Sequence, residues 1–314
     1  MEHELRPDLH AAPGGEVAVD AASPRHHLDV VVFESPLLRV GRWRCPADHP
    51  QFLDSGPSSD TLFVFPRGGV WIQHEGGRPF VADANTVTYY NKGQCYTRRR
   101  LSDWGDQCEW FAVSPDAVAE TLAHHEPAAV DRHDRPFRFT HGPSDPDSYL
   151  RQRAVFEHVS REPRADRLFV EEQVLSVLAD VARLAYVHHP ASPPPRARPR
   201  RDVDLVEAAR DVIARRFTEN LSLSEIARQV GASVFHLARI FKARTGFSLH
   251  AYRNQLRLRE ALERLAPRRQ RKPAKRHDDL VHIALDLGFS SHSHFTECFR
   301  RNFGKTPSAV RGAW

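Results

Sequence analysis

The sequence predicts an α+β protein: a β-rich domain with a helical arm, followed by a separate all-α domain. Residues 28–114 alternate short β-branched and aromatic runs with turn residues, whereas residues 115–189 have a helical period. From residue 203 onward every segment has helical spacing, and one helical unit occurs twice. The 314 residues suffice for two or three domains with cores of their own, and 40% hydrophobic and 27% charged residues are ordinary for a globular protein.

The β-rich part is predicted from runs in which β-branched and aromatic residues dominate. Strands are expected at residues 30–34, 37–45, 61–66, 69–75, 86–91 and 108–113. Turn signals such as SGPSSD and PRGG separate them at the spacing of a small barrel or sandwich. About half of the aromatic side chains should point inward, because side chains alternate between the two faces of a strand. Most of these are expected in the core, and a few could line an apolar ligand pocket.

The arm is predicted as three helices, at residues 115–125, 147–160 and 165–189. In the last, an apolar stripe is expected from Leu168, Leu175, Leu178, Ala182 and Ala185. Such a stripe would suit a dimer seam and packing inside the chain equally well. The segment 191–202, with four prolines and four arginines, is predicted to be a stiff linker between domains.

Charge is unevenly divided along the chain. Residues 203–314 contain 21 Lys/Arg and 11 Asp/Glu, a net charge of +10, whereas the whole chain is +5. The linker adds +3, so residues 1–190 carry −8. This division indicates that the C-terminal part meets a polyanion, although charge alone also fits a solvated basic face.

Targeting signals and cysteine usage both favour the cytoplasm. The first residues lack an apolar run and a basic start, so no signal peptide is expected, and nothing approaches the about 18 unbroken apolar residues of a membrane helix. The four cysteines, Cys45, Cys95, Cys108 and Cys298, are far apart and form no CxxC pair. This pattern argues against a zinc ribbon or a disulfide scaffold.

The C-terminal part begins with an amphipathic helix at 203–217. Ser222 and Glu225 form a capping box at the start of the next short helix, which ends at Gly231. A further helix is expected within residues 233–246, and two short helices joined by a glycine turn indicate a helix-turn-helix.

A second copy of this unit lies 57 residues downstream. Ile226-Ala227 and Gly231 match Ile283-Ala284 and Gly288 at identical spacing. The segment GFSLHAYR (246–253) then pairs with GKTPSAVR (304–311). The repeat predicts two helix-turn-helix units joined by a helix at 248–266, with Phe241, Phe295 and Phe299 in the core.

With the motif IA-x3-GF-x-S-x3-F-x3-F-[KR]-x3-G-x-TP, residues 203–314 resemble the AraC/XylS family of bacterial transcription regulators. The resemblance implies a cupin-type sensor and dimerisation domain at 28–190 and a DNA-binding domain at 203–314. It implies a sequence-specific regulator, expected to be an activator, that responds to a small molecule and is not an enzyme. Its implied partners are double-stranded promoter DNA, RNA polymerase, a small-molecule effector and a second copy of the chain, and no cofactor is expected.

The resemblance also implies which side chains meet DNA, because a helix fits the major groove and two such helices can lie one DNA turn apart, about 34 Å. The candidates are Ser233, Phe235, His236, Ala238, Arg239, Lys242, Ser291, His292, Ser293, Glu297, Arg300 and Arg301. Arg239 could grip guanine, with a phosphate contact or a surface ion pair as alternatives. Glu297 could accept from cytosine or be a solvated charge.

One departure from the family pattern lies between the two units. Residues 267–279 contain six Lys/Arg and two prolines and should break the connecting helix. This insertion is expected to loosen the geometry between the units or to clamp phosphate, with a solvated loop as the alternative.

Two other functions are compatible with an AraC-like arm: a cupin-type enzyme and a DNA-repair alkyltransferase, each fused to it. The enzyme would need a cluster of metal ligands, but His49 and the pair His74-Glu75 stand alone. His292 and His294 lie on different faces of a helix, so no metal is expected there either. The alkyltransferase would need clustered cysteines, which the sequence lacks.

Overall fold

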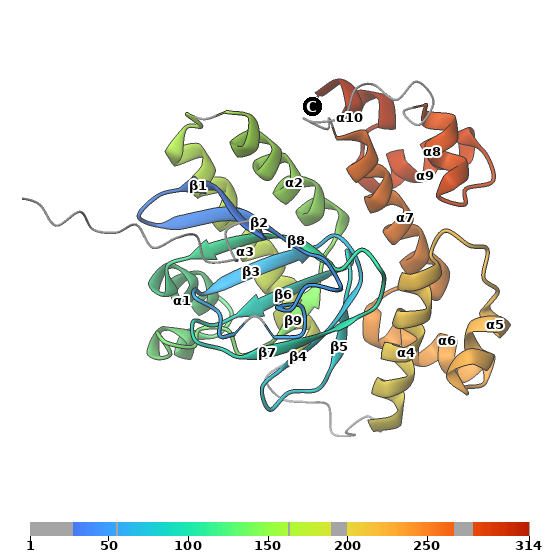
Figure 1. Cartoon of the computed structure of the whole chain (residues 1–314), viewed down its shortest axis with the longest axis horizontal. Coiled ribbons are helices and arrows are strands. Elements are labelled where there is room, and N and C mark those ends of the chain that lie inside the picture. The colour runs from blue at the N-terminus through green and yellow to red at the C-terminus, as the bar shows by residue number, and fades with distance from the viewer. Residues whose placement is uncertain (1–27, 55, 163, 190–199, 267–278, 314) are drawn as a thin grey trace, which may run out of the picture.

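The computed structural model describes residues 28–54, 56–162, 164–189, 200–266 and 279–313, which form a β-rich part and a helical part packed side by side (Figure 1). The strands are β1 (Asp29–Glu34), β2 (Leu38–Cys45), β3 (Leu62–Pro66), β4 (Val70–His74), β5 (Phe80–Ala82), β6 (Thr86–Tyr90), β7 (Tyr96–Arg100), β8 (Asp106–Val113) and β9 (His141–Pro143). The helices of the β-rich part are α1 (Pro115–Ala123), η2 (Pro127–Asp131), α2 (Pro146–Arg161) and α3 (Arg167–His188). Those of the helical part are α4 (Arg200–Arg216), α5 (Leu223–Val230), α6 (Val234–Thr245), α7 (Leu249–Leu265), α8 (Leu280–Asp286), α9 (His292–Phe303) and α10 (Pro307–Ala313).

The strands form two antiparallel sheets, which confirms the α+β class. The larger sheet has the order β1-β2-β8-β3-β6-β9 and the smaller one β5-β4-β7. All six predicted strands are present within one or two residues of their expected ends, but β5, β7 and β9 were not predicted. The sequence of β7 is YTRRR, and of its arginines Arg98 is 2% exposed because it turns inward to the carboxylate of Asp106, 2.5 Å away.

Helix α3 supplies the apolar face that covers the larger sheet. Its fully buried residues include Val170, Val174, Val181 and Ala185, so the apolar stripe of α3 packs against other residues of the same chain. The expectation for Leu168 was wrong, because its side chain is 66% exposed. Leu168 precedes Val170 by two residues, which places it about 200° round the helix from the buried face.

The two predicted connecting segments lie mostly outside the described residues. The predicted linker, residues 191–202, overlaps α4, which begins at Arg200. Asp202 lies in the first turn of α4, where a carboxylate favours the helix N-terminus. The remainder of that linker lies outside the described residues. The basic insertion at 267–279 also lies outside them except for Asp279, whose side chain caps α8 by accepting from the Val281 amide at 3.1 Å.

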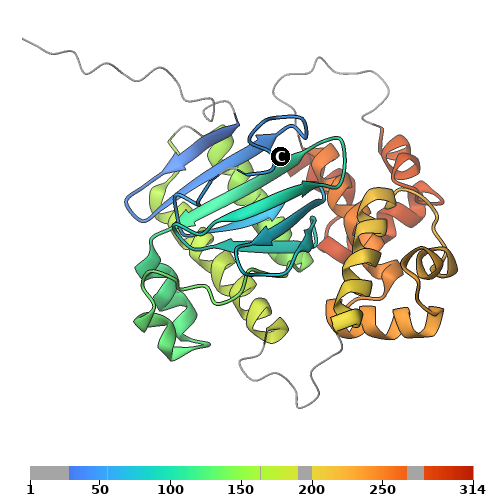
Figure 2. The same ribbon diagram turned by 60° about the horizontal axis from the view of Figure 1, so that its bottom comes forward.

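Helices α4 and α7 lie against the β-rich part (Figure 2), and buried polar side chains join them to it. Arg210 of α4 donates to Thr86 of β6 at 2.7 Å, and Tyr252 of α7 donates to Asp83 at 2.6 Å. Arg259 of α7 is 1% exposed and donates to the carbonyl of Ser144 at 2.7 Å. The two parts of the chain therefore share one continuous core.

No helix within the described residues is long and apolar enough to span a bilayer.

Candidate nucleic-acid interface and ligand cavity

The first helix-turn-helix unit consists of α5 and α6. The predicted capping box is present: Ser222 accepts from the amide of Glu225, whose carboxylate accepts in turn from the Ser222 amide at 2.7 Å. Gly231 has φ 69° at the turn, and Ser233 caps α6 by accepting from the His236 amide. Local sequence thus determines both helix starts and the turn between them.

The second unit consists of α8 and α9 and repeats this arrangement. Gly288 has φ +79° at the turn, and Ser291 caps α9 by accepting from the amide of His294. Phe295, Phe299 and Phe303 are buried along one face of α9, as expected for core residues. The predicted internal duplication is therefore present in three dimensions.

Helix α7 joins the two units and fixes them to a common core. From this helix, Arg257 donates to the carbonyl of Phe217 at 2.6 Å and to the carbonyl of Gly288 at 2.7 Å. These bonds join the end of α4 to the turn of the second unit. Arg257 is 3% exposed, so it acts as an internal brace and cannot contribute a phosphate contact.

On α6, three of the predicted DNA-contacting side chains project from one exposed face. Phe235 is 88% exposed, and Arg239 and Lys242 follow it four and seven residues later. His236 lies elsewhere: its Nε2 atom is 3.0 Å from Asp202 of α4, which ties the helix to its neighbour. Ala238 is half-buried and Ser233 is engaged as the cap.

On α9, the exposed face presents Ser293, Glu297, Arg300 and Arg301. Glu297 pairs with Arg300 at 2.9 Å and with Arg301 at 3.2 Å, and these hydrogen bonds lower the pKa of its carboxyl. The negative charge of Glu297 is therefore balanced by two arginines of its own helix. Of the other predicted residues, Ser291 is the cap and His292 is half-buried.

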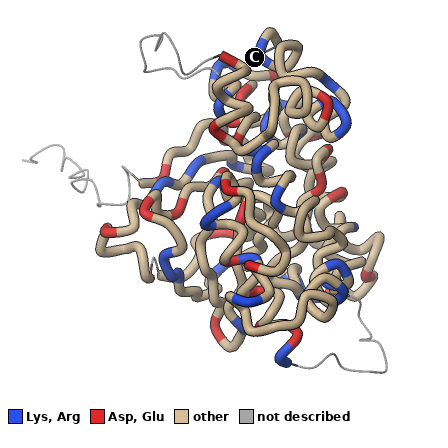
Figure 3. Tube along the Cα trace, turned by 90° about the vertical axis from the view of Figure 1, so that its right-hand side faces the viewer, with Lys and Arg blue, Asp and Glu red and all other residues tan. Residues whose placement is uncertain are grey.

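The outward side of the helical part carries both signs of charge. Figure 3 faces this side and shows acidic positions interspersed among the basic ones. Several basic residues counted in the net charge are internal, since Arg210, Arg257 and Arg259 are at most 6% exposed. The electrostatic attraction for a polyanion thus comes from fewer side chains than the sequence count indicates.

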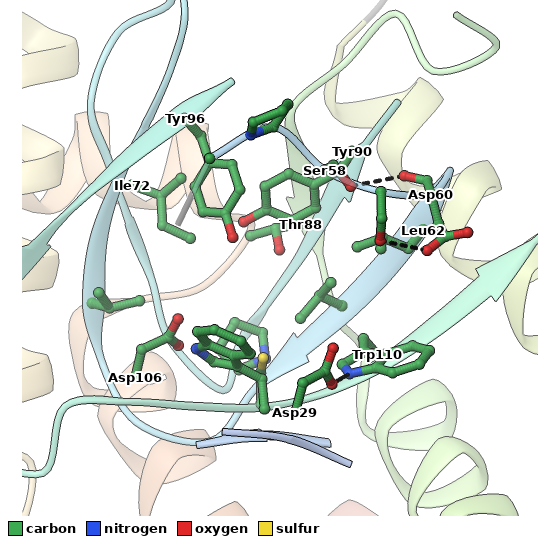
Figure 4. A pocket seen from close by; sticks show the side chains of 18 of the residues that line it. Asp29, Ser58, Asp60, Leu62, Ile72, Thr88, Tyr90, Tyr96, Asp106 and Trp110 are labelled. Atoms are coloured by element: carbon green, nitrogen blue, oxygen red, sulfur yellow. Dashed lines mark hydrogen bonds between the residues drawn. The ribbon is translucent and has the colours of Figure 1, made fainter. Parts of the chain in front are cut away.

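A cavity of about 180 Å³ lies between the two sheets of the β-rich part (Figure 4). Its walls come from β1, β2, β3, β6 and β8 of the larger sheet and from β4 and β7 of the smaller one. Trp43, Tyr90, Tyr96 and Trp110 supply aromatic surface to it, in line with the expectation that a few strand aromatics line a pocket.

Three carboxylates reach the cavity wall. Asp106 is paired with Arg98, and Asp60 is paired with Arg39. Asp29 instead accepts a hydrogen bond from the indole nitrogen of Trp110 at 2.7 Å. Burial raises the pKa of Asp29, an effect that this hydrogen bond partly offsets.

The histidines considered as isolated metal ligands each have a different hydrogen-bond partner. His74 is 1% exposed with its Nδ1 atom 2.7 Å from Gln94, and burial lowers its pKa to about 4. His49 accepts from the amide of Gln51 at 3.2 Å. By contrast, His141, His188 and His189 come together, with one potential ligand atom of each within 4.8 Å of the others. Sequence reasoning missed this group, although the HH pair at the end of α3 was a signal for it.

A helix-turn-helix domain model matches residues 226–313. The chain is 38% identical over 93 residues to the probable transcription factor PqrA of Proteus vulgaris, a match that spans 30% of this chain and 70% of PqrA. It is 36% identical over 97 residues to the transcriptional activator RhaS of Escherichia fergusonii, but this match spans only 31% of RhaS.

Among solved structures, an AraC-type DNA-binding regulator from Chromobacterium violaceum is 31% identical, with a TM-score of 0.30 over 34% of this chain and 89% of that one. ToxT from Vibrio cholerae is 13% identical, with a TM-score of 0.34 over 88% of this chain and 98% of that one. Two helix-turn-helix units on one connecting helix define a DNA-binding transcription regulator. The chain belongs to the AraC family of transcription regulators, on the strength of the match to most of PqrA.

Proposed function

We propose that this protein activates transcription in response to a small molecule bound between the two sheets of its N-terminal part. The observation that carries the proposal is the combination of exposed recognition helices with a walled cavity in one chain. In this proposal residues 28–190 sense the effector and dimerise, and the helices from Arg200 onward bind promoter DNA and contact RNA polymerase. The protein would act in the cytoplasm, where promoter DNA is found.

The proposal includes no enzymatic activity. An alkyltransferase would require a nucleophilic thiolate, but burial raises the pKa of the thiols of Cys45, Cys108 and Cys298. Cys45 and Cys108 lie on the paired strands β2 and β8, whereas Cys298 lies on α9 of the helical part, so the four cysteines do not form the single cluster that such an enzyme needs.

Arg239 is the leading candidate for a side chain that recognises a DNA base. Its guanidinium lies on the exposed face of α6 together with Phe235, a side chain suited to packing on a thymine methyl. Lys242 lies one turn further along, where a point charge suits phosphate.

We expect Arg239→Ala to weaken binding of the full-length protein to its selected DNA site by about 1–3 kcal/mol while changing binding to random DNA little. The loss follows from removal of a bidentate contact to one guanine. Fluorescence anisotropy on both duplexes, using a site selected from a random library, measures it. Lys242→Ala is the matched control and should weaken both duplexes alike, with a shallower salt dependence. An equal loss on both duplexes for Arg239→Ala would make Arg239 a phosphate contact.

The cavity chemistry indicates the class of effector. At the cavity wall, aromatic faces beside a carboxylate that has no ion pair among the described residues suit a small organic cation, because cation–π attraction and the charge of Asp29 act together. Asp60 and Asp106 already have arginine partners, so Asp29 is the carboxylate with most to gain from a cation.

We expect benzyltrimethylammonium to bind the full-length protein more tightly than benzyl alcohol, which has a similar ring but no charge. Asp29→Asn should weaken the cation by about tenfold, or about 1.4 kcal/mol, and leave the alcohol unaffected. Titration calorimetry of both probes measures this difference. Equal affinity of the two probes, or an unchanged cation affinity in Asp29→Asn, would exclude a cationic effector.

A further inference from the structure

Three histidines from two elements meet where the β-rich part borders the helical part. His141 comes from β9, His188 is the last residue of α3, and His189 follows it as the helix cap. The ring centroid of His141 lies 5.2 Å from that of His189 and 6.1 Å from that of His188, and the two neighbouring rings are 4.7 Å apart. Residues 47 positions apart thus present three imidazoles to one point.

Hydrogen bonds orient two of the three rings for metal binding. The Nε2 atom of His189 is 2.7 Å from the carbonyl oxygen of His141. A carbonyl only accepts, so Nε2 must carry the proton and the lone pair of His189 lies on Nδ1. The Nδ1 atom of His141 is 3.1 Å from the hydroxyl oxygen of Thr140, and in the tautomer in which Nδ1 donates to this oxygen, Nε2 of His141 has the lone pair that can bind a metal. Metal-binding histidines usually have an outer partner of this kind.

The space beside these rings can hold an ion. A cavity of about 40 Å³ is lined by His141 and His188 from one part of the chain and by Glu207, Arg210 and Arg244 from the other. Glu207 is engaged by the amide of Val81 at 2.8 Å and by Arg210. The lining also contains the side-chain oxygens of Asn85, Thr86, Thr245 and Tyr252, but among the described residues Glu207 is its single carboxylate. Ca²⁺ and Mg²⁺ are usually held by carboxylates, so the imidazole nitrogens point to a different metal.

The spacing of the potential ligand atoms on the three rings is also close to that of a zinc site. Two ligand atoms of a tetrahedral zinc, each about 2.1 Å from the metal, are separated by about 3.4 Å. The three potential ligand atoms lie within 4.8 Å of one another, so rotations of half-buried rings would close the gap. Neighbouring guanidinium groups of Arg138, Arg210 and Arg244 oppose a cation, which favours a metal held by strong nitrogen donation.

We propose that His141, His188 and His189 bind one Zn²⁺ ion or a similar imidazole-preferring divalent metal, with a fourth position left for water or an exogenous ligand. The site is separate from the cavity between the sheets. The metal would join the end of α3 to β9 beside the helical part, so its occupancy would favour one arrangement of the two parts.

The test is a titration of metal-free, full-length protein with Zn²⁺ alone, followed by calorimetry and by the visible spectrum of a Co²⁺-substituted sample. The wild-type protein should bind one equivalent at this site and give the intense absorption of tetrahedral Co²⁺. His141→Ala combined with His188→Ala should remove that equivalent. The control combines His133→Ala with His282→Ala, two exposed histidines in ion pairs, and should retain it.

A second variant is needed because replacing His141 also removes its stacking on Phe80, whose ring centroid is 4.0 Å away, and this loss could disturb folding. His188→Gln keeps that contact and should still weaken Zn²⁺ binding by more than about 100-fold, since it removes a ligand. The proposal is overturned if the wild-type protein binds no zinc, or if the equivalent survives in His188→Gln. Survival would assign the metal to others among the 19 histidines. DNA binding is not needed for this readout, so its outcome is independent of the proposed regulatory function.

Discussion

Gly288→Ala is expected to destabilise the protein by more than about 3 kcal/mol and to abolish specific DNA binding, because it disrupts the turn of the second helix-turn-helix unit. Gly288 has φ +79°, and a Cβ atom there would lie 2.1 Å from the carbonyl oxygen of Thr218 and 2.7 Å from the guanidinium of Arg257. The first of these neighbours is backbone and cannot move aside locally. Arg257 would also have to give up its bond to the Gly288 carbonyl.

The matched control is Gly231→Ala, at the equivalent position of the first unit. Gly231 has φ +69°, but its Cβ would meet nothing within 4 Å. Only the left-handed backbone conformation is penalised there, by about 1–2 kcal/mol. Urea unfolding followed by circular dichroism, together with DNA anisotropy, compares the two. Similar losses for both substitutions would show that the close contact at Gly288 is relieved by a small shift of α8.

Arg210→Met is expected to cost about 3–5 kcal/mol of unfolding free energy, because it leaves buried acceptors without their partner. The Arg210 side chain is 7% exposed and lies 3.8 Å from Asp83, whose side chain is 2% exposed. It also donates to the hydroxyl of Tyr252 at 2.9 Å and to Thr86 at 2.7 Å. Methionine fills similar space but donates no hydrogen bond, so the loss is electrostatic.

Arg216→Met provides the comparison on the same helix. Arg216 pairs with Glu219 at 2.7 Å, but both side chains are substantially exposed, so the urea midpoint should not change. Arg210→Met should in addition loosen the helical part from the β-rich part, seen as faster exchange of the amide of Val81, which is bonded to Glu207 of the same cluster. An unchanged midpoint in Arg210→Met would show that water replaces the arginine and that the contact between the two parts is not closely packed.

Much of the helical part was predictable because its signals are local. The capping box of Ser222 and Glu225 and the glycines at 231 and 288 specify helix ends within a few residues of themselves. Spacing then placed Phe295 and Phe299 in the core. The strands of the larger sheet were equally predictable from the sequence, apart from the three-residue β9, whose sequence HGP does not favour a strand.

Positions that depend on distant partners were decided by the tertiary structure. A run of three arginines gives no strand signal, yet β7 forms because β4 pairs with it and Asp106 neutralises Arg98. Basic residues counted toward DNA attraction, among them Arg257 and Arg259, proved to be internal braces that bond to backbone carbonyls. Likewise, His141 meets His188 and His189 only because β9 packs against the end of α3. By itself the sequence determined the duplicated DNA-binding module. Contacts between residues far apart in the chain decided which charges face solvent, where a cavity opens and which histidines meet. The sequence did not predict these features, because such contacts leave no periodic pattern in the local sequence of either partner.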